Sequence, residues 1–126
     1  MSVTSPKGFA AAGVTAGLKP SGKPDLALVV NHGPHKAAAG LFTGNRVQAA
    51  PVQWSRQVLV DQALQAVILN SGGANACTGP DGFADTHHTA EQVATALQAA
   101  GRDVGPIDVA VCSTGLIGVR LPMDKI

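Results

Sequence analysis

A short apolar run that passes directly into small polar residues decides the fold of this chain: Ala66-Val67-Ile68-Leu69-Asn70-Ser71-Gly72-Gly73-Ala74-Asn75. Consecutive apolar residues bounded by turn residues are typical of a strand buried on both faces of a sheet. A second run, Ile107 to Cys112, passes in the same way into Ser113-Thr114-Gly115. We therefore expect two buried strands, each of which ends in small polar residues and glycine.

Two helices are predicted around these strands. The clearer one runs from Asp85 to Ala100, with apolar residues along one face. Asp85 or Thr86 is the expected N-cap, and Gly101 stands where a helix usually ends. The second helix is expected from Pro51 to Leu64.

Further strands are expected toward the amino terminus. Leu26 to Val30 is a continuous apolar run closed by turn residues. Ala37 to Phe42 is a second candidate, and the two are expected to pair as an antiparallel hairpin. A shorter strand is expected from Phe9 to Val14. This order of elements predicts an α/β fold, a layered mixed sheet with helices.

Composition narrows the class of protein. The chain has 126 residues, the length of one domain, and a formal net charge of +1. No basic excess is present for phosphate contacts, which argues against nucleic-acid binding. The apolar stretches are too short to span a membrane, and no signal peptide is visible. We therefore expect residues 1–126 to form a single cytoplasmic domain with reduced thiols.

The last residues predict an unfinished element. Leu121-Pro122-Met123-Asp124-Lys125-Ile126 has the pattern of a helix that is beginning, with Pro122 near its first turn. Natural domains seldom stop where a helix starts. We therefore expect the chain to be a fragment, or one piece of something longer.

The two strand ends are the candidate sites, because ligand sites gather at that edge of α/β sheets. In the loop from Asn70 to Asn75, glycines permit close approach of a ligand and the amides offer donors and acceptors. The alternative is a glycine-rich turn whose amides cap its own backbone. At the second end, the Thr114 hydroxyl and the Gly115 N–H are neighbouring donors that could stabilise an oxyanion. The alternative there is an ordinary Ser/Thr turn.

Cysteine and histidine offer a weaker alternative. Cys77 lies in the first polar loop, ahead of a helix that carries His87 and His88, which permits a thiol nucleophile with an imidazole base. Cys112 lies within an apolar run and is expected in the core. The histidines lack the convergent ligands that a metal site needs, so we expect no metal.

Five segments of the chain together carry a resemblance to a known family. They are Pro6-Lys7-Gly8-Phe9, Ala38-Ala39-Gly40-Leu41-Phe42-Thr43, residues 68–79, residues 111–118 and Leu121-Pro122-Met123. In order and with matching spacing, over essentially the whole chain, they resemble the glutamate N-acetyltransferase (ornithine acetyltransferase) family of bifunctional arginine-biosynthesis proteins.

The resemblance implies a function and a fold. The family moves an acetyl group from N-acetylornithine to glutamate through an acetyl-threonine intermediate, and some members also take acetyl from acetyl-CoA. No cofactor is implied. The precursor cuts itself into an α and a β chain, and the new amino-terminal threonine of the β chain is the nucleophile. Matched position by position, the oxyanion hole falls on Thr114 and Gly115. The expected fold is the amino-terminal part of the family's α-β-β-α arrangement.

The resemblance also implies what this chain lacks. The cleavage site, the nucleophilic threonine and the substrate-gripping residues of the family all lie downstream of Ile126. We therefore expect the partners to be the rest of the α chain and the β chain in an oligomer, and the chain alone to be inactive. The alternatives are a non-catalytic fragment that self-associates or binds a small ligand, and a cysteine hydrolase that uses Cys77.

Overall fold

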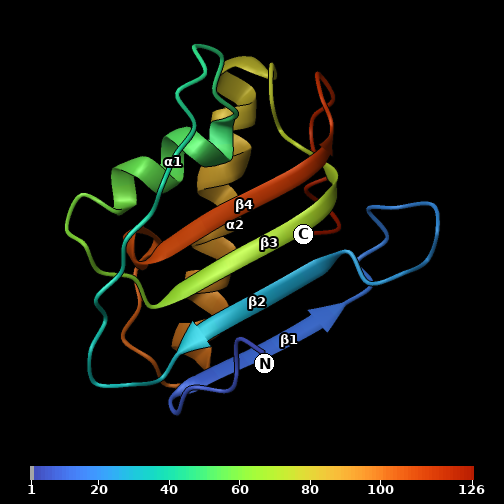
Figure 1. Cartoon of the computed structure of the whole chain (residues 1–126). Helices are drawn as coiled ribbons and strands as arrows, with labels where there is room; N and C mark the ends of the chain where they lie inside the picture. The colour runs from blue at the N-terminus through green and yellow to red at the C-terminus, as the bar shows by residue number, and fades with distance from the viewer. Residues whose placement is uncertain (1) are drawn as a thin grey trace.

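The computed structural model describes residues 2–126 and contains one four-stranded mixed sheet and two helices (Figure 1). The strands lie in chain order and are β1 (Phe9–Val14), β2 (Leu26–Asn31), β3 (Ala66–Gly73) and β4 (Val109–Leu116). β1 and β3 each pair antiparallel with β2, whereas β3 and β4 are parallel. The helices are α1 (Ala50–Val58) and α2 (Gly79–Ala99). The predicted α/β layered fold is confirmed.

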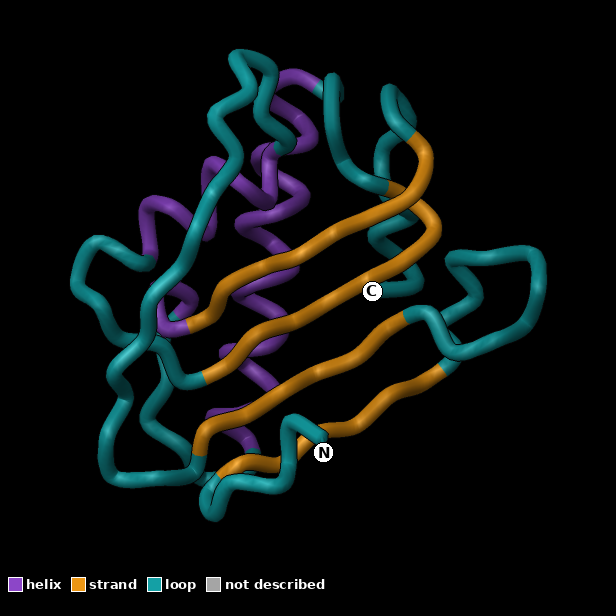
Figure 2. The backbone as a smooth tube through the Cα atoms, viewed as in Figure 1, coloured by secondary structure: helices purple, strands orange, loops and turns teal. Residues whose placement is uncertain are grey.

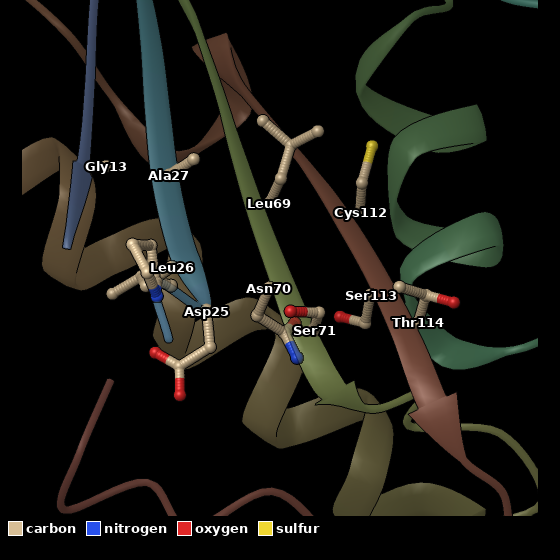
Figure 3. Close-up of a pocket in the computed structure, with 11 residues that line it drawn as sticks. Gly13, Asp25, Leu26, Ala27, Leu69, Asn70, Ser71, Cys112, Ser113 and Thr114 are labelled. Atoms are coloured by element: carbon tan, nitrogen blue, oxygen red, sulfur yellow. The ribbon is translucent and has the colours of Figure 1, made fainter. Parts of the chain in front are cut away.

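Alternation along the strands gives the sheet two different faces. Val30, Ile68 and Val111 are buried and belong to one hydrophobic core with residues of α2. Leu69 and Cys112, which neighbour Ile68 and Val111 in sequence, point to the opposite face (Figure 3). No helix in residues 2–126 covers that face (Figure 2). We call it the open face; it decides where the candidate site lies.

Helix α1 packs along the edge of the sheet, against β4. The Trp54 indole N–H donates to the Val109 carbonyl oxygen at 2.9 Å. The Ser55 hydroxyl donates to the Val111 carbonyl at 2.8 Å and accepts from the Val111 N–H at 3.0 Å. Because β4 is the edge strand, its outward backbone groups have no neighbouring strand to pair with. The buried side chains of α1 therefore satisfy the groups that the sheet leaves unpaired.

Replacing Ser55 by alanine is expected to lower the free energy of unfolding by about 1–3 kcal/mol, because both backbone groups of Val111 lose their partner while buried. Urea unfolding followed by the fluorescence of Trp54, the single tryptophan, measures this change. Gln57→Ala is the matched control on the exposed side of α1. Equal stability of the two variants would contradict the role of Ser55.

Helix α2 begins earlier than the sequence predicts. It starts at Gly79, so Asp85 and Thr86 lie inside it and the predicted N-cap is wrong. Buried Asn75 ties the preceding loop to the first turns of this helix, since its Nδ2 donates to the Gly82 carbonyl at 2.7 Å and to the Thr86 hydroxyl at 2.9 Å. The predicted end is confirmed, since Gly101 has a φ of 81° directly after the helix.

The predicted hairpin between residues 26–30 and 37–42 is wrong. Strand β2 pairs with β1 and β3 instead. Only Ala37 forms a bridge, with Ala63, flanked by hydrogen bonds from Leu64 N–H to the Lys36 carbonyl (2.9 Å) and from Ala38 N–H to the Gln62 carbonyl (2.8 Å). Helix α1 ends at Val58 rather than at Leu64, because the chain turns after it, with Gln62 at a φ of 55°, before Ala63 pairs with Ala37.

Two other boundaries differ from the prediction. Residues Pro106–Asp108 form a 3₁₀ turn, so β4 starts at Val109 and continues past Cys112 to Leu116. Residues 121–126 form a turn rather than the start of a helix, with Lys125 N–H donating to the Pro122 carbonyl at 2.9 Å. Within residues 2–126 we find no helix of the length and hydrophobicity needed to cross a membrane.

Candidate functional site

The two polar strand ends lie side by side. Because β3 and β4 are parallel, their carboxyl ends meet at the same edge of the sheet, where Ser71 pairs with Thr114 and Gly72 with Gly115. The chain separates these residues by more than 40 positions, yet the ladder makes them neighbours. The two polar segments that the sequence singled out therefore lie at one edge of the sheet.

Glycine is required where the strand ends meet. A Cβ on Gly115 would lie 2.5 Å from the carbonyl carbon of Gly72 and 2.7 Å from the Gly73 nitrogen. Gly72 and Gly115 also have φ values of 124° and 133°, which residues with a side chain rarely adopt. The register shifts at Gly73, so regular pairing ends here. Backbone therefore touches backbone directly near the carboxyl end of β4, where the predicted oxyanion donors lie. We call Thr114 and Gly115 the oxyanion turn, because β4 departs from regular pairing at Gly115, whose φ is positive.

A cleft of about 300 Å³ opens beside this turn, on the open face of the sheet (Figure 3). Its floor is apolar, and its polar groups gather at the strand ends, where Thr114 is exposed. A cleft with an apolar wall and a few polar groups at one end is typical of a small-molecule site. It is lined by Gly13, Pro24, Asp25, Leu26, Ala27, Leu69, Asn70, Ser71, Cys112, Ser113 and Thr114.

The segment that follows Gly115 is held against the loop that follows β3. Ala74 N–H donates to the Leu116 carbonyl and Gly118 N–H to the Ala76 carbonyl, both at 2.8 Å. These two hydrogen bonds thus continue the side-by-side, parallel course of the two segments beyond the strands. They fix the path of the chain on the carboxyl side of the predicted oxyanion turn.

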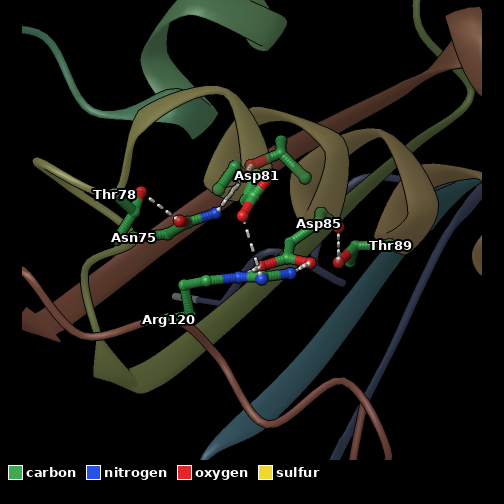
Figure 4. Close-up of polar contacts among 8 residues, drawn as sticks. Asn75, Thr78, Asp81, Asp85, Thr89 and Arg120 are labelled. Carbon is green, nitrogen blue, oxygen red and sulfur yellow. Dashed lines mark hydrogen bonds and ion pairs between the residues drawn. The ribbon is translucent and has the colours of Figure 1, made fainter.

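An ion pair fastens the same segment to α2. Arg120 donates from Nη2 and Nε to the two oxygens of Asp85, at 2.6 and 2.8 Å, and its Nη1 lies 3.4 Å from Asp81 Oδ2 (Figure 4). Asp85 is buried, whereas Arg120 is half exposed. The hydrogen bonds to Asp85 raise the pKa of Arg120 above its ordinary value. Sequence reasoning missed this pair because nothing in the local pattern links residues so far apart.

The amides of the first polar loop serve the protein itself. Asn70 Nδ2 donates to the Gly73 carbonyl at 3.1 Å, and Asn75 is fully buried. The Asn75 side-chain oxygen accepts from the Thr78 hydroxyl at 2.7 Å (Figure 4). Of the two interpretations of this loop, these contacts favour the glycine-rich turn that caps its own backbone.

The cysteine and histidine candidates do not form a compact group. Cys77 precedes α2, and His87 follows Gly79 by eight residues, which corresponds to about 12 Å along a helix axis. His87 instead stacks on Trp54 with a centroid distance of 4.9 Å, and His88 contacts Glu91 at 3.3 Å. No group of metal-binding side chains is found within residues 2–126.

Cys112 is not in the core, contrary to the prediction. It is exposed on the open face, because Val111 takes the inward position and side chains alternate along β4. Partial desolvation of the thiol beside the sheet still raises the pKa of Cys112 above its ordinary value. Because the residues from Val109 to Cys112 are all apolar, the sequence does not show which of them face the helices and which face the open side of the sheet.

These features define a class: an α/β protein with a candidate ligand site at the carboxyl ends of two parallel strands. Residues 10–126 match the model of the ArgJ family. The chain belongs to the ArgJ family, as the resemblance predicted. It is 68% identical over 124 residues to the arginine biosynthesis bifunctional protein ArgJ of Mycolicibacterium paratuberculosis, covering 98% of this chain and 31% of that protein. The Streptomyces coelicolor ArgJ is 67% identical over 126 residues, covering 100% and 32%.

Solved structures agree with the family assignment. A crystal structure of ornithine acetyltransferase from Mycobacterium tuberculosis, in complex with ornithine, is 70% identical, with a TM-score of 0.97. The match covers 98% of this chain and 64% of that one. The ArgJ of Bacillus halodurans is 42% identical with a TM-score of 0.86, covering 99% and 62%. The chain spans about a third of the length of the curated relatives that it matches, and corresponds to their amino-terminal part.

Proposed function

We propose that this chain is the amino-terminal part of an acetyltransferase that moves an acetyl group from N-acetylornithine to glutamate. The reaction proceeds through an acetyl-threonine intermediate, and Thr114 and Gly115 form the oxyanion hole. The observation that carries the proposal is the 70% identity and TM-score of 0.97 to an ornithine acetyltransferase. The position of Thr114 beside a cleft at the strand ends supports the role of the turn.

The chemistry required of this turn is charge stabilisation. A nucleophile that attacks the acetyl carbonyl converts its oxygen into an alkoxide. A hydroxyl and a backbone N–H fixed at adjacent positions donate hydrogen bonds to that oxygen without reorganising during the reaction. The threonine nucleophile is contributed by the β chain, which lies outside this sequence. Ornithine leaves as the acetyl group passes to the threonine oxygen. The amino group of glutamate then takes the acetyl group and the threonine hydroxyl is regenerated; acetyl-CoA is a candidate alternative donor.

The remainder of the enzyme covers the open face. Leu69 is 37% exposed there, and Cys112 beside it is exposed as well. Apolar surface of this kind is normally buried against a partner. We expect the rest of the α chain and the β chain to pack on it in an oligomeric, cytoplasmic enzyme. The chain alone is then inactive and self-associates through the same face.

The test joins this chain to the part of the M. tuberculosis ornithine acetyltransferase that follows the matched region; we call the product the joined enzyme. It is expected to release ornithine from N-acetylornithine in the presence of glutamate, and this chain alone is expected to release none. Absence of transfer by a folded joined enzyme would contradict the proposed function.

The cysteine alternative is tested in the same assay. Cys77→Ser removes the thiol and leaves a hydroxyl of similar size in its place. Turnover within about twofold of the parent is expected, since Cys77 has no part in the proposed chemistry. A loss of turnover would instead favour a role for the thiol.

A further inference from the structure

Asp25 is a buried carboxylate that the proposed reaction does not use. It is 4% exposed, and both of its oxygens accept backbone hydrogen bonds. Oδ1 accepts from Ala16 at 2.7 Å, and Oδ2 accepts from Leu18 at 2.7 Å and Lys19 at 2.9 Å. The side chain therefore organises the segment that connects β1 to β2.

The backbone of Asp25 connects the end of β1 to the end of β3. Its N–H donates to the Val14 carbonyl at 3.0 Å, and its carbonyl accepts from the Ser71 N–H at 2.8 Å. Ser71 directly precedes Gly72 and pairs with Thr114. One residue thus holds both the connecting segment and the strand that carries the predicted oxyanion turn.

Direct backbone contacts lead from this segment to Gly115. A Cβ on Gly72 would lie 2.8 Å from the Leu18 carbonyl oxygen, and a Cβ on Gly115 would lie 2.7 Å from the Gly72 oxygen. No side chain lies between these three residues to absorb a displacement. Because the ladder is irregular at Gly73, strand pairing alone does not fix the turn.

A carboxylate suits this position better than an amide does. Burial alone would raise the pKa of Asp25, but the N–H groups of Lys19, Ala16 and Leu18 outweigh it and hold the pKa below its ordinary value. An asparagine of the same shape would direct an NH₂ group at one of these donors. The segment between β1 and β2 would then lose its hydrogen bond at Ala16 or those at Leu18 and Lys19.

We propose that Asp25 is a positioning residue, which sets the turn of Thr114 and Gly115 by holding Leu18 against Gly72. This inference rests on the proposed function in one respect only, which is that Thr114 and Gly115 act as oxyanion donors. The carboxylate of Asp25 binds the backbone of residues 16–19 and not Thr114 or Gly115. Its effect passes through Gly72 to the donors.

The test is Asp25→Asn in the joined enzyme. We expect kcat to fall by about 10- to 100-fold, because a small displacement of catalytic donors is costly. KM for N-acetylornithine should stay within about twofold, since the donors act on the transition state. Hydrogen exchange of peptides that cover residues 109–118 should become faster. Asp103→Asn, at an exposed position, is the matched control and should change neither measurement.

A double-mutant cycle separates positioning from general loss of stability. If Asp25 acts through the turn, Asp25→Asn should cost less than about threefold in a Thr114→Ala enzyme. Effects that simply multiply, or unchanged exchange in residues 109–118, would overturn the proposal. If Asp25→Asn does not fold, Leu18→Pro, which removes one of the three donors, gives the deciding kinetics. A joined enzyme that transfers no acetyl group would overturn the proposed function. In that case hydrogen exchange in residues 109–118 alone would decide whether Asp25 positions Thr114 and Gly115.

Discussion

Replacing Thr114 by alanine is expected to lower kcat for acetyl transfer by the joined enzyme about 100- to 1,000-fold. The loss of one preorganised donor removes stabilisation that exists only when the carbonyl oxygen becomes an alkoxide. KM should change little, because the neutral acetyl group needs that donor less. Initial rates of ornithine release at saturating N-acetylornithine measure the effect.

Two further variants control this prediction. Thr114→Ser keeps the hydroxyl and should recover most of the rate. Thr95→Ala removes an exposed hydroxyl of α2 that does not line the cleft, so it should leave the rate unchanged. A Thr114→Ala enzyme that keeps the parent turnover would defeat the oxyanion assignment. Unchanged folding is expected, because Thr114 is exposed.

The parts of the fold that local pattern determines were predictable. Residues 66–69 and 109–112 form strands, as short apolar runs predict, although Leu69 and Cys112 show that only one face of these strands is buried. Gly101 ends α2 because it readily adopts a positive φ. The partner of β2 was not predictable. Pairing with Phe9–Val14 rather than residues 37–42 depends on where the Lys36–Ala38 backbone finds its hydrogen bonds, which is a long-range property.

In the candidate site, too, local features were predictable from the sequence and long-range contacts were not. Each strand end carried its own signal of glycine and small polar residues, and the resemblance selected Thr114 and Gly115. That the two ends touch follows from the parallel pairing of β3 and β4, which no local pattern contains. Asp25 and the Arg120–Asp85 pair carry no local signal, because their partners are backbone groups or residues distant in sequence. Single charged residues in polar segments are usually solvated, so only the structure distinguishes Asp25, Asp85 and Arg120 from the other charged residues of the chain.

Replacing Gly115 by alanine is expected to lower the free energy of unfolding by about 3–5 kcal/mol. One part of the loss comes from the φ of 133°, which alanine rarely adopts. The other comes from the new methyl group, which would overlap the carbonyl carbon of Gly72 at 2.5 Å. Backbone atoms in a sheet cannot move aside as a flexible side chain can. Urea unfolding followed by Trp54 fluorescence measures the change.

Gly118 separates these two contributions. It also has a positive φ, 81°, but nothing lies within 4 Å of a Cβ placed there. Gly118→Ala should therefore cost only the conformational part, about 1–2 kcal/mol. Equal losses at the two positions would mean that the contact with Gly72 contributes nothing. A larger loss at Gly115 would mean that glycine is required there by the close approach of β3, whether or not its N–H stabilises an oxyanion. The catalytic role must then be tested at Thr114, where removing the donor does not disturb the contact between the strands.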